Sequence, residues 1–469
     1  MKVTQVAIRP AEASLAAGRP SLTPELLAAS GARYSRNNEG LEAILSKIDP
    51  AHLDRSVESI FRMIDYGHQS IADMVPVAMF MDGISIWLAY YVWTLCPTAG
   101  GQESSTRYLK LTADALIPPE QLGVPEPLVE QWTRSMQAAF EAYGEALATW
   151  EEAALQDPLV TRIPAELLRD SSESAQKKVA RMRRNYGFDR ARYFLPLAAT
   201  TNVMLVMSAR GWVQLCQNLL SYPLPEANLL GQAIRDELDL CAPRLTRHAE
   251  AKGSIVAGIR SELEDWCSRA AAGPSEHLRG DAASPAKPPR ASLSVFAPES
   301  SGEPGVESDL RFHDNRYAWL GSTLRRTAVR FGWEAIAFAE IRDLNRHRTG
   351  SKFCPLIPQG FYSADDQAPH PGVLERLEPL CEVGRAASLQ AHHRLAAGDW
   401  SCVYWAVLGT QFPFEHTTTA DKFIYEAELR TGQGAHFRYA LHLRDALELW
   451  YQQYPKTRGL VLEGSAEPE

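Results

Sequence analysis

The stretch Met74–Cys96, with the sequence MVPVAMFMDGISIWLAYYVWTLC, decides the fold of the first half of the chain. It is apolar enough to be weighed as a membrane span. Pro76, Asp82 and Gly83 interrupt the run, however, and no basic loop follows it. We therefore expect a buried strand that leads directly into a buried helix rather than a segment that crosses a membrane.

The second half of the chain contains a similar pair of elements. Val77–Phe80 and Ala328–Phe331 each predict a short strand, and each is followed by a predicted helix of roughly fifteen residues. The apolar stripe of the second helix consists of Ala337, Phe338, Ile341 and Leu344. After an intervening helical stretch, each half closes with a long amphipathic helix, predicted over 203–220 and over 420 to about 451.

Two units in the same order indicate a tandem duplication. The alternative, a chance alignment of two strand and helix pairs, stays open because few residues are identical between the halves. From Gly273 to Ser308 the composition shifts to Pro, Gly, Ala and Ser, which predicts a flexible linker. The predicted domains are therefore residues 1–272 and 309–469, joined by the linker 273–308.

Bulk composition excludes several classes of protein. The chain has 469 residues, with a net charge of −9 and a pI near 5.8, so its overall field repels a nucleic acid polymer. A small anion can still bind where arginines cluster. The seven cysteines contain no C-x-x-C pair, and the N-terminus has no apolar signal segment, which together predict a cytoplasmic protein. His392, His393 and Cys402 match no metal-site spacing, so no metal is expected.

Two polar fragments far apart in the sequence have the composition of an anion site. Arg346-His347-Arg348 places two guanidinium forks around a histidine, and such forks bind phosphate in a bidentate manner. Glu103-x-Ser105-x-Arg107 offers an acceptor, a hydroxyl and another fork. On residue chemistry alone, a solvated helix end and a hydrogen-bonded turn remain equally good interpretations.

Together these fragments resemble the signature of the flavin-dependent thymidylate synthases (ThyX), Arg-His-Arg-x-x-Ser-x-(Asn/Gln)-Glu-x-Ser-x-Arg. The first half also contains Ala32-Arg33-Tyr34-Ser35, Gly67-His68-Gln69-Ser70 and Ala191-Arg192-Tyr193-Phe194-Leu195-Pro196, which are similar to further segments of the family. In the second half, Leu429-Arg430 followed by Ala435-His436 is similar to the helix with the arginine that polarises the uracil ring. The resemblance implies an α+β fold of two tandem, helix-rich units, each with a small, mostly antiparallel sheet.

The resemblance implies a division of labour between the halves. Arg346 and Arg430 would be the catalytic residues, with Arg430 polarising the ring. The residues implied to bind the substrate are Gln102, Glu103, Ser105, Arg107, Arg192, Arg346 and Arg430. Conversely, Leu219 occupies the place of Arg430, Gly409 that of Arg192, and Pro358 that of Arg107. Each half lacks family residues that the other half retains, so we expect one intact composite site and one defunct site per chain.

For the cofactor, the resemblance implies FAD. Its predicted ligands are Ser35, Ser70, Glu103, Arg346, His347, Arg348, Arg210 and Gln214. Taken alone, Ser70 would instead be interpreted as a helix cap. The segment Thr431-Gly432-Gln433-Gly434 lacks the third glycine and the preceding strand of a dinucleotide fingerprint, so it is not counted among them.

The implied reaction is the methylation of C5 of a pyrimidine nucleotide, by default deoxyuridylate. Carbon would come from methylenetetrahydrofolate, and reducing equivalents from NADPH through FAD. Asp343 stands where the family has a glutamine and adds negative charge, so a modified or biosynthetic pyrimidine nucleotide is an alternative substrate. A non-catalytic nucleotide- or flavin-binding protein is the alternative from another class. Since the family forms four-subunit assemblies, two duplicated chains predict a homodimer.

Overall fold

The computed structural model describes residues 1–6, 11–18, 20–34, 40–47, 57–58, 70–107, 110–161, 163–298, 305–432 and 435–464. They form two compact units. Unit 1 consists of residues 1–104, 116–124 and 199–264, and unit 2 consists of residues 105–115, 125–198 and 265–469. This division differs from the domains predicted from the linker composition, because a large part of the first half belongs to unit 2.

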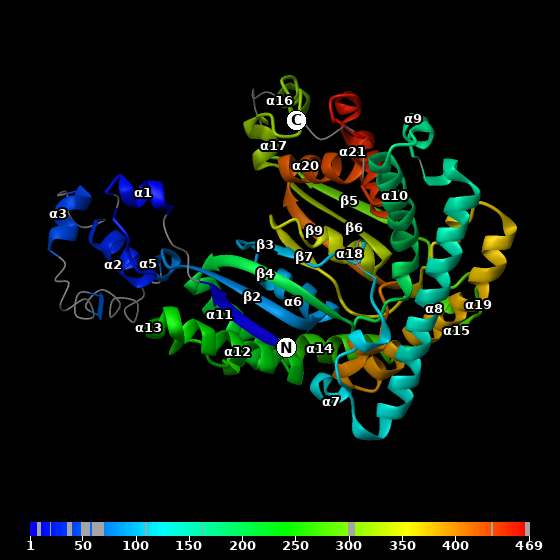
Figure 1. Ribbon diagram of the computed structural model, residues 1–469, viewed down its shortest axis with the longest axis horizontal. Coiled ribbons are helices and arrows are strands. Elements are labelled where there is room, and N and C mark those ends of the chain that lie inside the picture. Colours follow the sequence, from blue (N-terminus) through cyan, green and yellow to red (C-terminus); the bar gives the residue numbers. More distant parts are fainter. Residues whose placement is uncertain are drawn as a thin grey trace. The chain divides into compact units, whose positions relative to one another are not determined.

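Unit 1 is built on a four-stranded antiparallel sheet with the order β1-β2-β4-β3. The strands are β1 (Lys2–Val6), β2 (Pro76–Ser85), β3 (Gly100–Glu103) and β4 (Thr200–Ser208). Its described helices are α1 (Glu12–Ala16), α2 (Pro24–Tyr34), α3 (Gly40–Ser46), α5 (Ser70–Asp73), α6 (Ile86–Leu95), α7 (Pro119–Leu122), α11 (Ala209–Ser221), α12 (Pro225–Cys241) and α13 (Pro243–Thr246). Helices α11 and α12 pack on this sheet (Figure 1), and α14 (Gly253–Ala270) begins in unit 1.

The stretch Met74–Cys96 forms the predicted buried strand and helix. Strand β2 leads directly into α6, in which seven of the ten residues are buried. The junction is a capped helix start, because the Ser85 hydroxyl accepts a hydrogen bond from the Leu88 N–H at 2.9 Å. Glu226 is fully buried and accepts hydrogen bonds from both the backbone N–H and the hydroxyl of Ser85, each at 2.7 Å. None of the described helices is long and apolar enough to span a bilayer.

Unit 2 repeats this plan with a five-stranded antiparallel sheet. Its order is β5-β6-β9-β7, and β8 pairs with β9 as well. The strands are β5 (Ala291–Phe296), β6 (Ala328–Ala337), β7 (Ser351–Phe353), β8 (Gly360–Phe361) and β9 (Thr410–Thr419). Helices α18 (Phe338–Leu344) and α20 (Ala420–Thr431) follow β6 and β9, and α21 (Phe437–Gln453) packs on β5 (Figure 1). The predicted α+β class with antiparallel sheets is confirmed.

The predicted linker contains an ordered strand. Residues 291–296 pair along their whole length with β6, with Ala291 opposite Trp333 and Phe296 opposite Ala328. The sequence ASLSVF alternates apolar and small polar residues, which suits an edge strand better than a linker. The helices α15 (Glu276–Arg279) and α16 (Val306–Asp309) also lie in this stretch, whereas residues 299–304 lie outside the described part of the chain.

Helices from the first half of the sequence, two of them long, complete unit 2. These are α8 (Val129–Gln156), α9 (Ala165–Arg169) and α10 (Glu173–Ala191), and α8 packs against α19 (Pro371–Ala396). The Trp132 indole donates a hydrogen bond to the Tyr404 carbonyl at 2.9 Å, and Arg376 pairs with Glu152 at 2.6 Å. The remaining elements are α17 (Ser322–Arg326) and the short 3-10 helices η2 (Ala113–Ala115), η3 (Glu126–Leu128), η4 (Pro158–Thr161), η5 (Arg192–Phe194), η6 (Asp365–Gln367), η7 (Trp400–Trp405) and η8 (Pro455–Thr457).

Two predicted helices were wrong in their extent. The segment 203–220 begins as β4, in which exposed and buried residues alternate, and becomes helical only at Ala209. The segment from 420 to about 451 is two helices, because α20 ends at Thr431 and α21 starts at Phe437. The helices after β2 and β6 are also shorter than predicted, since both strands continue to Ser85 and Ala337.

The two sheets share one register. Gly100 pairs with Val206, and Ser351 pairs with Thr417; in each case the partner lies two residues before the end of its strand. Gly100 and Ser351 are therefore equivalent positions. Both central strands, β2 and β6, also have a register shift before the helix that follows them. The alignment of the two signature fragments made from the sequence agrees with this register.

Candidate active site

The centre of the candidate site in unit 2 is the carboxylate of Asp343, near the end of α18. Both terminal nitrogens of Arg192 lie 3.1 Å from Asp343 Oδ2, and Nη2 of Arg346 lies 3.5 Å from Oδ1. Arg192 is 1% exposed and Asp343 is 5% exposed, so this is an ion pair of the protein interior. It joins η5 from the first half of the sequence to α18 from the second.

The arginines around Asp343 keep its carboxylate charged. Burial alone would raise the pKa of Asp343, but the cations of Arg192, Arg346 and Arg430 hold it well below its usual range. Arg342, also buried, donates a hydrogen bond to the Thr106 hydroxyl at 3.2 Å. Positive charge therefore exceeds negative charge in this part of unit 2, which favours an anionic ligand.

Arg107 is held on a second carboxylate. Its Nε and Nη2 lie 2.6 and 2.8 Å from the two oxygens of Asp189 in α10, a bidentate pair. Burial opposes the charged guanidinium, but the hydrogen bond and the charge of Asp189 raise the pKa of Arg107. Ser105 Oγ accepts a hydrogen bond from the Arg107 N–H at 3.2 Å, and His436 Nε2 lies 3.1 Å from the Asp189 carbonyl. The fragment 105–107 is thus fixed to α10, which in turn contacts His436 at the start of α21.

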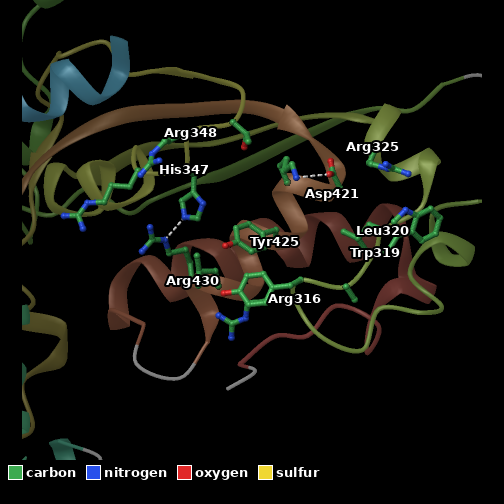
Figure 2. Close-up of a pocket in the computed structure, with 15 residues that line it drawn as sticks. Arg316, Trp319, Leu320, Arg325, His347, Arg348, Asp421, Tyr425 and Arg430 are labelled. Atoms are coloured by element: carbon green, nitrogen blue, oxygen red, sulfur yellow. Dashed lines mark hydrogen bonds and ion pairs between the residues drawn. The ribbon is translucent and has the colours of Figure 1, made fainter. Parts of the chain in front are cut away.

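Arg430, near the end of α20, is held at three places. Its Nε donates to His347 Nε2 at 2.7 Å, and its Nη2 donates to the Asp343 carbonyl at 3.0 Å. The guanidinium carbon lies 5.1 Å from the centre of the Tyr439 ring. Figure 2 shows the hydrogen bond from Arg430 to His347 at the edge of a pocket.

That pocket has a volume of about 600 Å³. Six cationic side chains line it: Arg316, Arg325, Arg346, Arg348, Lys422 and Arg430. Among the described residues that line it, Asp421 is the one carboxylate and lies 3.3 Å from Lys422, and the aromatic side chains are Tyr317, Trp319 and Tyr425. Arg325 lies 5.4 Å from the Trp319 ring centre, and Figure 2 shows the two side by side at the outer wall. Cations and ring faces together suit a ligand with both phosphates and aromatic rings.

The structure brings some of the predicted site residues together. Ser105, Arg107, Arg192, Arg346, His347, Arg348 and Arg430 all lie in unit 2. Arg192, Arg346 and Arg430 contact Asp343 directly, whereas Arg107 is held by Asp189. Arg192 was expected to clamp the substrate phosphate. Here its terminal nitrogens are instead bonded to Asp343, because a fully buried guanidinium needs a counter-charge.

The other predicted residues belong to unit 1 or are not described. Gln102 and Glu103 end strand β3, and Ser70 begins the short helix α5. Gln214 lies in α11, and Arg210 in the same helix pairs with Asp73 at 2.9 Å. Ser35 and the segment 67–69 lie outside the described residues, as do 433 and 434. The cofactor role of these residues stays a prediction.

The predicted equivalences between the halves need one correction. Leu219 and Arg430 are each the eleventh residue of their helices, which agrees with the prediction. Gly409, however, directly precedes β9, whereas Arg192 lies in η5, well before β4. A side chain at Gly409 would collide with Tyr362 and Tyr193 carbonyl oxygens, so close packing requires this glycine. The turn equivalent to η5 is η7, which contains no arginine.

Several residues of the site were not singled out from the sequence. Asp189, Glu426 and His416 are buried partners of the predicted residues, and Arg316, Trp319 and Arg325 line the pocket. A signal existed for Glu426, which precedes Arg430 by one helical turn. Another was the mixture of cations and aromatics over 311–326. Among the residues that the structure describes, no cluster of His, Cys, Asp and Glu could hold a metal ion.

Comparison with known protein families gives a match in the first half of the chain. Residues 20–244 match the family described as thymidylate synthase complementing protein. The resemblance seen in the sequence is thereby confirmed for this stretch, which contains Ser105, Arg107 and Arg192 but ends before Arg346.

Two further proteins are similar to this chain. The UPF0159 protein Ta1429 of Thermoplasma acidophilum is 24% identical over 479 residues, which cover 92% of this chain and 93% of the relative. Among solved structures, the UMP/dUMP methylase PolB from Streptomyces cacaoi, bound with 5-Br dUMP, is 15% identical. That match covers 53% of this chain and 93% of PolB, with a TM-score of 0.31.

Proposed function

We propose that this chain is a flavin-dependent enzyme that methylates C5 of a pyrimidine nucleotide, by default deoxyuridylate, at the arginine cluster of unit 2. One observation carries the proposal. Residues from two distant segments, each with half of a nucleotide-site signature, lie in one compact unit around Asp343 and Asp189. The match of residues 20–244 to the thymidylate synthase complementing protein family supports the same reaction class.

In this proposal, the arginines divide the substrate between them. Arg107 and Arg346 bind the phosphate, and Ser105 donates a hydrogen bond to it. Arg430 faces the uracil ring, where a permanent cation beside the N3/O2 edge stabilises negative charge that develops as C5 is alkylated. Arg192 acts indirectly: it holds Asp343, whose carbonyl in turn holds Arg430.

The pocket in unit 2 fits the predicted FAD. Its six cations suit a pyrophosphate, and Tyr317, Trp319 and Tyr425 offer ring faces on which a flavin or adenine ring can stack. When bound, the flavin supplies the redox step, with NADPH as the reductant and methylenetetrahydrofolate as the carbon donor. Within the pocket, Arg346 and Arg348 would hold phosphate oxygens. Ser70, Glu103, Arg210 and Gln214 remain proposed ligands from unit 1.

Two cysteines of unit 2, Cys381 and Cys402, are poorly suited to nucleophilic catalysis. Burial raises the pKa of the Cys381 thiol to about 12 and raises that of Cys402 as well. A thiol that stays protonated at neutral pH is a weak nucleophile. This supports a mechanism in which electrostatic activation by Arg430, rather than a covalent bond to cysteine, makes C5 reactive.

One observation favours an altered substrate. Asp343 places a buried carboxylate inside the group of arginines that would meet the phosphate. A second anion in that position repels the substrate phosphate and reshapes the donors around it. A modified or biosynthetic pyrimidine nucleotide is therefore the second candidate for the same reaction.

We also propose that the chain arose by tandem duplication and assembles as a homodimer, so that two chains supply four ThyX-like units. The shared strand order and register of the two sheets support the duplication. Light scattering on the purified protein should give the mass of two chains, and a monomer would contradict the assembly.

The decisive experiment begins with the colour of the purified protein. We expect a yellow protein, or one that becomes yellow with FAD and releases FAD on denaturation. With methylenetetrahydrofolate and deoxyuridylate present, NADPH oxidation and thymidylate formation should follow. A yellow protein inert toward deoxyuridylate would favour the altered substrate, and a protein that cannot take up FAD would refute the proposal.

A further inference from the structure

The guanidinium of Arg430 is the end of a buried polar network. We call Arg430, His347, Glu426 and His416 the Arg430 network. Glu426 Oε2 lies 4.0 Å from His347 Nδ1 and 3.0 Å from His416 Nδ1, and His416 Nε2 lies 2.7 Å from the Thr349 carbonyl. His416 and Glu426 are at most 1% exposed, and the His347 side chain is 8% exposed.

The hydrogen bond to Arg430 fixes the tautomer of His347. A guanidinium only donates, so His347 Nε2 must accept and therefore has no hydrogen. In the neutral ring the hydrogen then lies on Nδ1, which faces the carboxylate of Glu426. Burial, opposed by the carboxylate of Glu426 and assisted by the cation of Arg430, lowers the pKa of His347 to about 3. His347 therefore stays neutral and remains an acceptor at physiological pH.

The network leaves one end of Arg430 for a ligand. Nε is bonded to His347, Nη2 is bonded to the Asp343 carbonyl, and the guanidinium lies against the Tyr439 ring. Nη1 makes no hydrogen bond to any residue that the structure describes. Since Arg430 lines the pocket, its Nη1 group is available to donate to a ligand bound there.

Unit 1 shows that the fold does not need this network. By the shared register, the equivalents of His347, His416, Glu426 and Arg430 are Cys96, Leu205, Leu215 and Leu219. Each of these apolar side chains is at most 3% exposed. The same strand and helix arrangement therefore packs well with an apolar interior. Buried charges are costly, so their presence in unit 2 indicates a function rather than a requirement of folding.

We propose that His347 is a positioning residue for Arg430: together with the Asp343 carbonyl it fixes the guanidinium at two nitrogens, while Glu426 and His416 fix the imidazole from behind. The network thus presents the Nη1 end of the guanidinium, in a fixed orientation, to the ring of the substrate. This inference rests on the proposed function, in which Arg430 polarises the pyrimidine. It assigns His347 to that arginine rather than to direct hydrogen bonding of the cofactor through Nε2.

The first test needs no substrate. In the ¹⁵N spectrum of the whole protein labelled at histidine, the His347 signals are identified by their loss in His347→Gln. We expect a neutral ring with hydrogen on Nδ1 and none on Nε2. A hydrogen on Nε2, or a charged ring at neutral pH, would overturn the inference. This test is independent of whether the chain methylates deoxyuridylate, so its failure is distinct from failure of the proposed function.

The second test is a double-mutant cycle on turnover, or on nucleotide affinity if no turnover is found. His347→Ala should lower kcat by about tenfold to a hundredfold, a range typical of residues coupled in one network, with a smaller change in KM. His347→Gln, whose amide oxygen can accept from Arg430, should recover most of this loss. In the Arg430→Lys variant, whose side chain lacks the guanidinium fork, the additional change His347→Ala should lower kcat only slightly further. Additive losses would overturn the proposal.

A buried pair between α20 and the loop that follows α16 provides the matched control. His313 Nε2 lies 2.7 Å from Glu428 Oε1, and both side chains are fully buried, but neither lines the pocket. His313→Ala should leave kcat near the wild-type value although it removes a similar contact. If His347→Ala does not fold, His347→Cys, which adopts the residue of unit 1, serves in its place. Equal losses of kcat at His313 and His347 would refute a positioning role.

Discussion

The two sheets of this chain have the same strand order, but the helix that follows the third strand of each order buries apolar side chains in one unit and charged side chains in the other. In unit 1, the helix after β4 buries Leu215 and Leu219; in unit 2, the equivalent helix carries Glu426 and Arg430. The backbone plan is therefore compatible with either an apolar or a charged core. An apolar interior is the more stable choice for most cores, so the difference supports the proposal that the chemistry takes place in unit 2.

The largest expected effect concerns the charge at the centre of unit 2. Asp343→Asn leaves the buried cation of Arg192 without its partner, and removing one member of a buried pair costs about 3–5 kcal/mol. Urea unfolding should show this loss. Asp366→Asn is the control, because its pair with Arg438 is partly exposed and is expected to contribute less than about 1 kcal/mol. Equal losses would mean that the interior of unit 2 is not organised by Asp343.

Replacing Arg430 of unit 2 by leucine, the residue at the equivalent position of unit 1, should strongly lower the activity. Arg430→Leu removes the group that stabilises developing charge, and turnover should fall by about 10²- to 10³-fold. The opposite unit supplies the comparison: Leu219→Met preserves volume and should cost less than about 1.5 kcal/mol in unfolding free energy, with nucleotide affinity unchanged. Steady-state kinetics measures the turnover, and calorimetry measures the unfolding free energy and the nucleotide affinity. Similar loss of nucleotide binding in both variants would contradict a single working site.

A substitution at Arg107 tests whether the first half of the sequence contributes a phosphate-binding residue to the proposed site in unit 2. Arg107→Ala should weaken deoxyuridylate binding by about 10- to 100-fold, the range of a hydrogen bond to a charged group. Deoxyuridine lacks the phosphate, and its affinity should change much less. Isothermal titration with both ligands makes the comparison, and an equal loss for both would show that Arg107 does not bind the phosphate.

The pH dependence of the free energy of unfolding should arise from buried histidines of unit 2. Burial lowers the pKa of His347 and of His436 to about 3, whereas an unfolded histidine has a pKa near 6.5. As pH falls from about 6.5 toward 3, the unfolded state binds protons that the folded state does not, so stability falls by about 1.4 kcal/mol per pH unit for each histidine. Urea midpoints at several pH values should show a shallower slope for His347→Gln. An unchanged slope would contradict the burial of His347 as a neutral ring.

The smallest effect is expected at the wall of the pocket. Trp319→Ala removes a ring face and its contact with Arg325, and such a cation–π contact contributes about 0.5–1 kcal/mol at an exposed site. FAD affinity, measured by flavin fluorescence, should fall several-fold. Trp400, in the 3-10 helix η7, does not line the pocket, and Trp400→Ala should leave FAD affinity unchanged.

Much of the fold followed from local pattern. The alternation and apolar content of Met74–Cys96 predicted a buried strand and helix, and both formed. The segment 203–220 was less predictable, because its apolar residues satisfy a helical and a strand period at once. Pairing with β2 decided that its first part is a strand. The strand 291–296 was hidden in a Pro- and Ser-rich segment for a similar reason: it is stabilised by long-range contacts, which are its pairing with β6 and its packing against α21.

By itself, the sequence determined which side chains are available for chemistry: two incomplete fragments, with arginines that survive in complementary positions. Guanidinium groups recognise phosphate by their own geometry, but only the resemblance of both fragments to one family signature predicts a nucleotide site. Only the tertiary structure decided what each arginine does. Arg192 is bonded to Asp343 and Arg430 to His347 because long-range packing brings η5, α18 and α20 together, and a buried charge takes the nearest available partner. No local sequence pattern specifies such a partner.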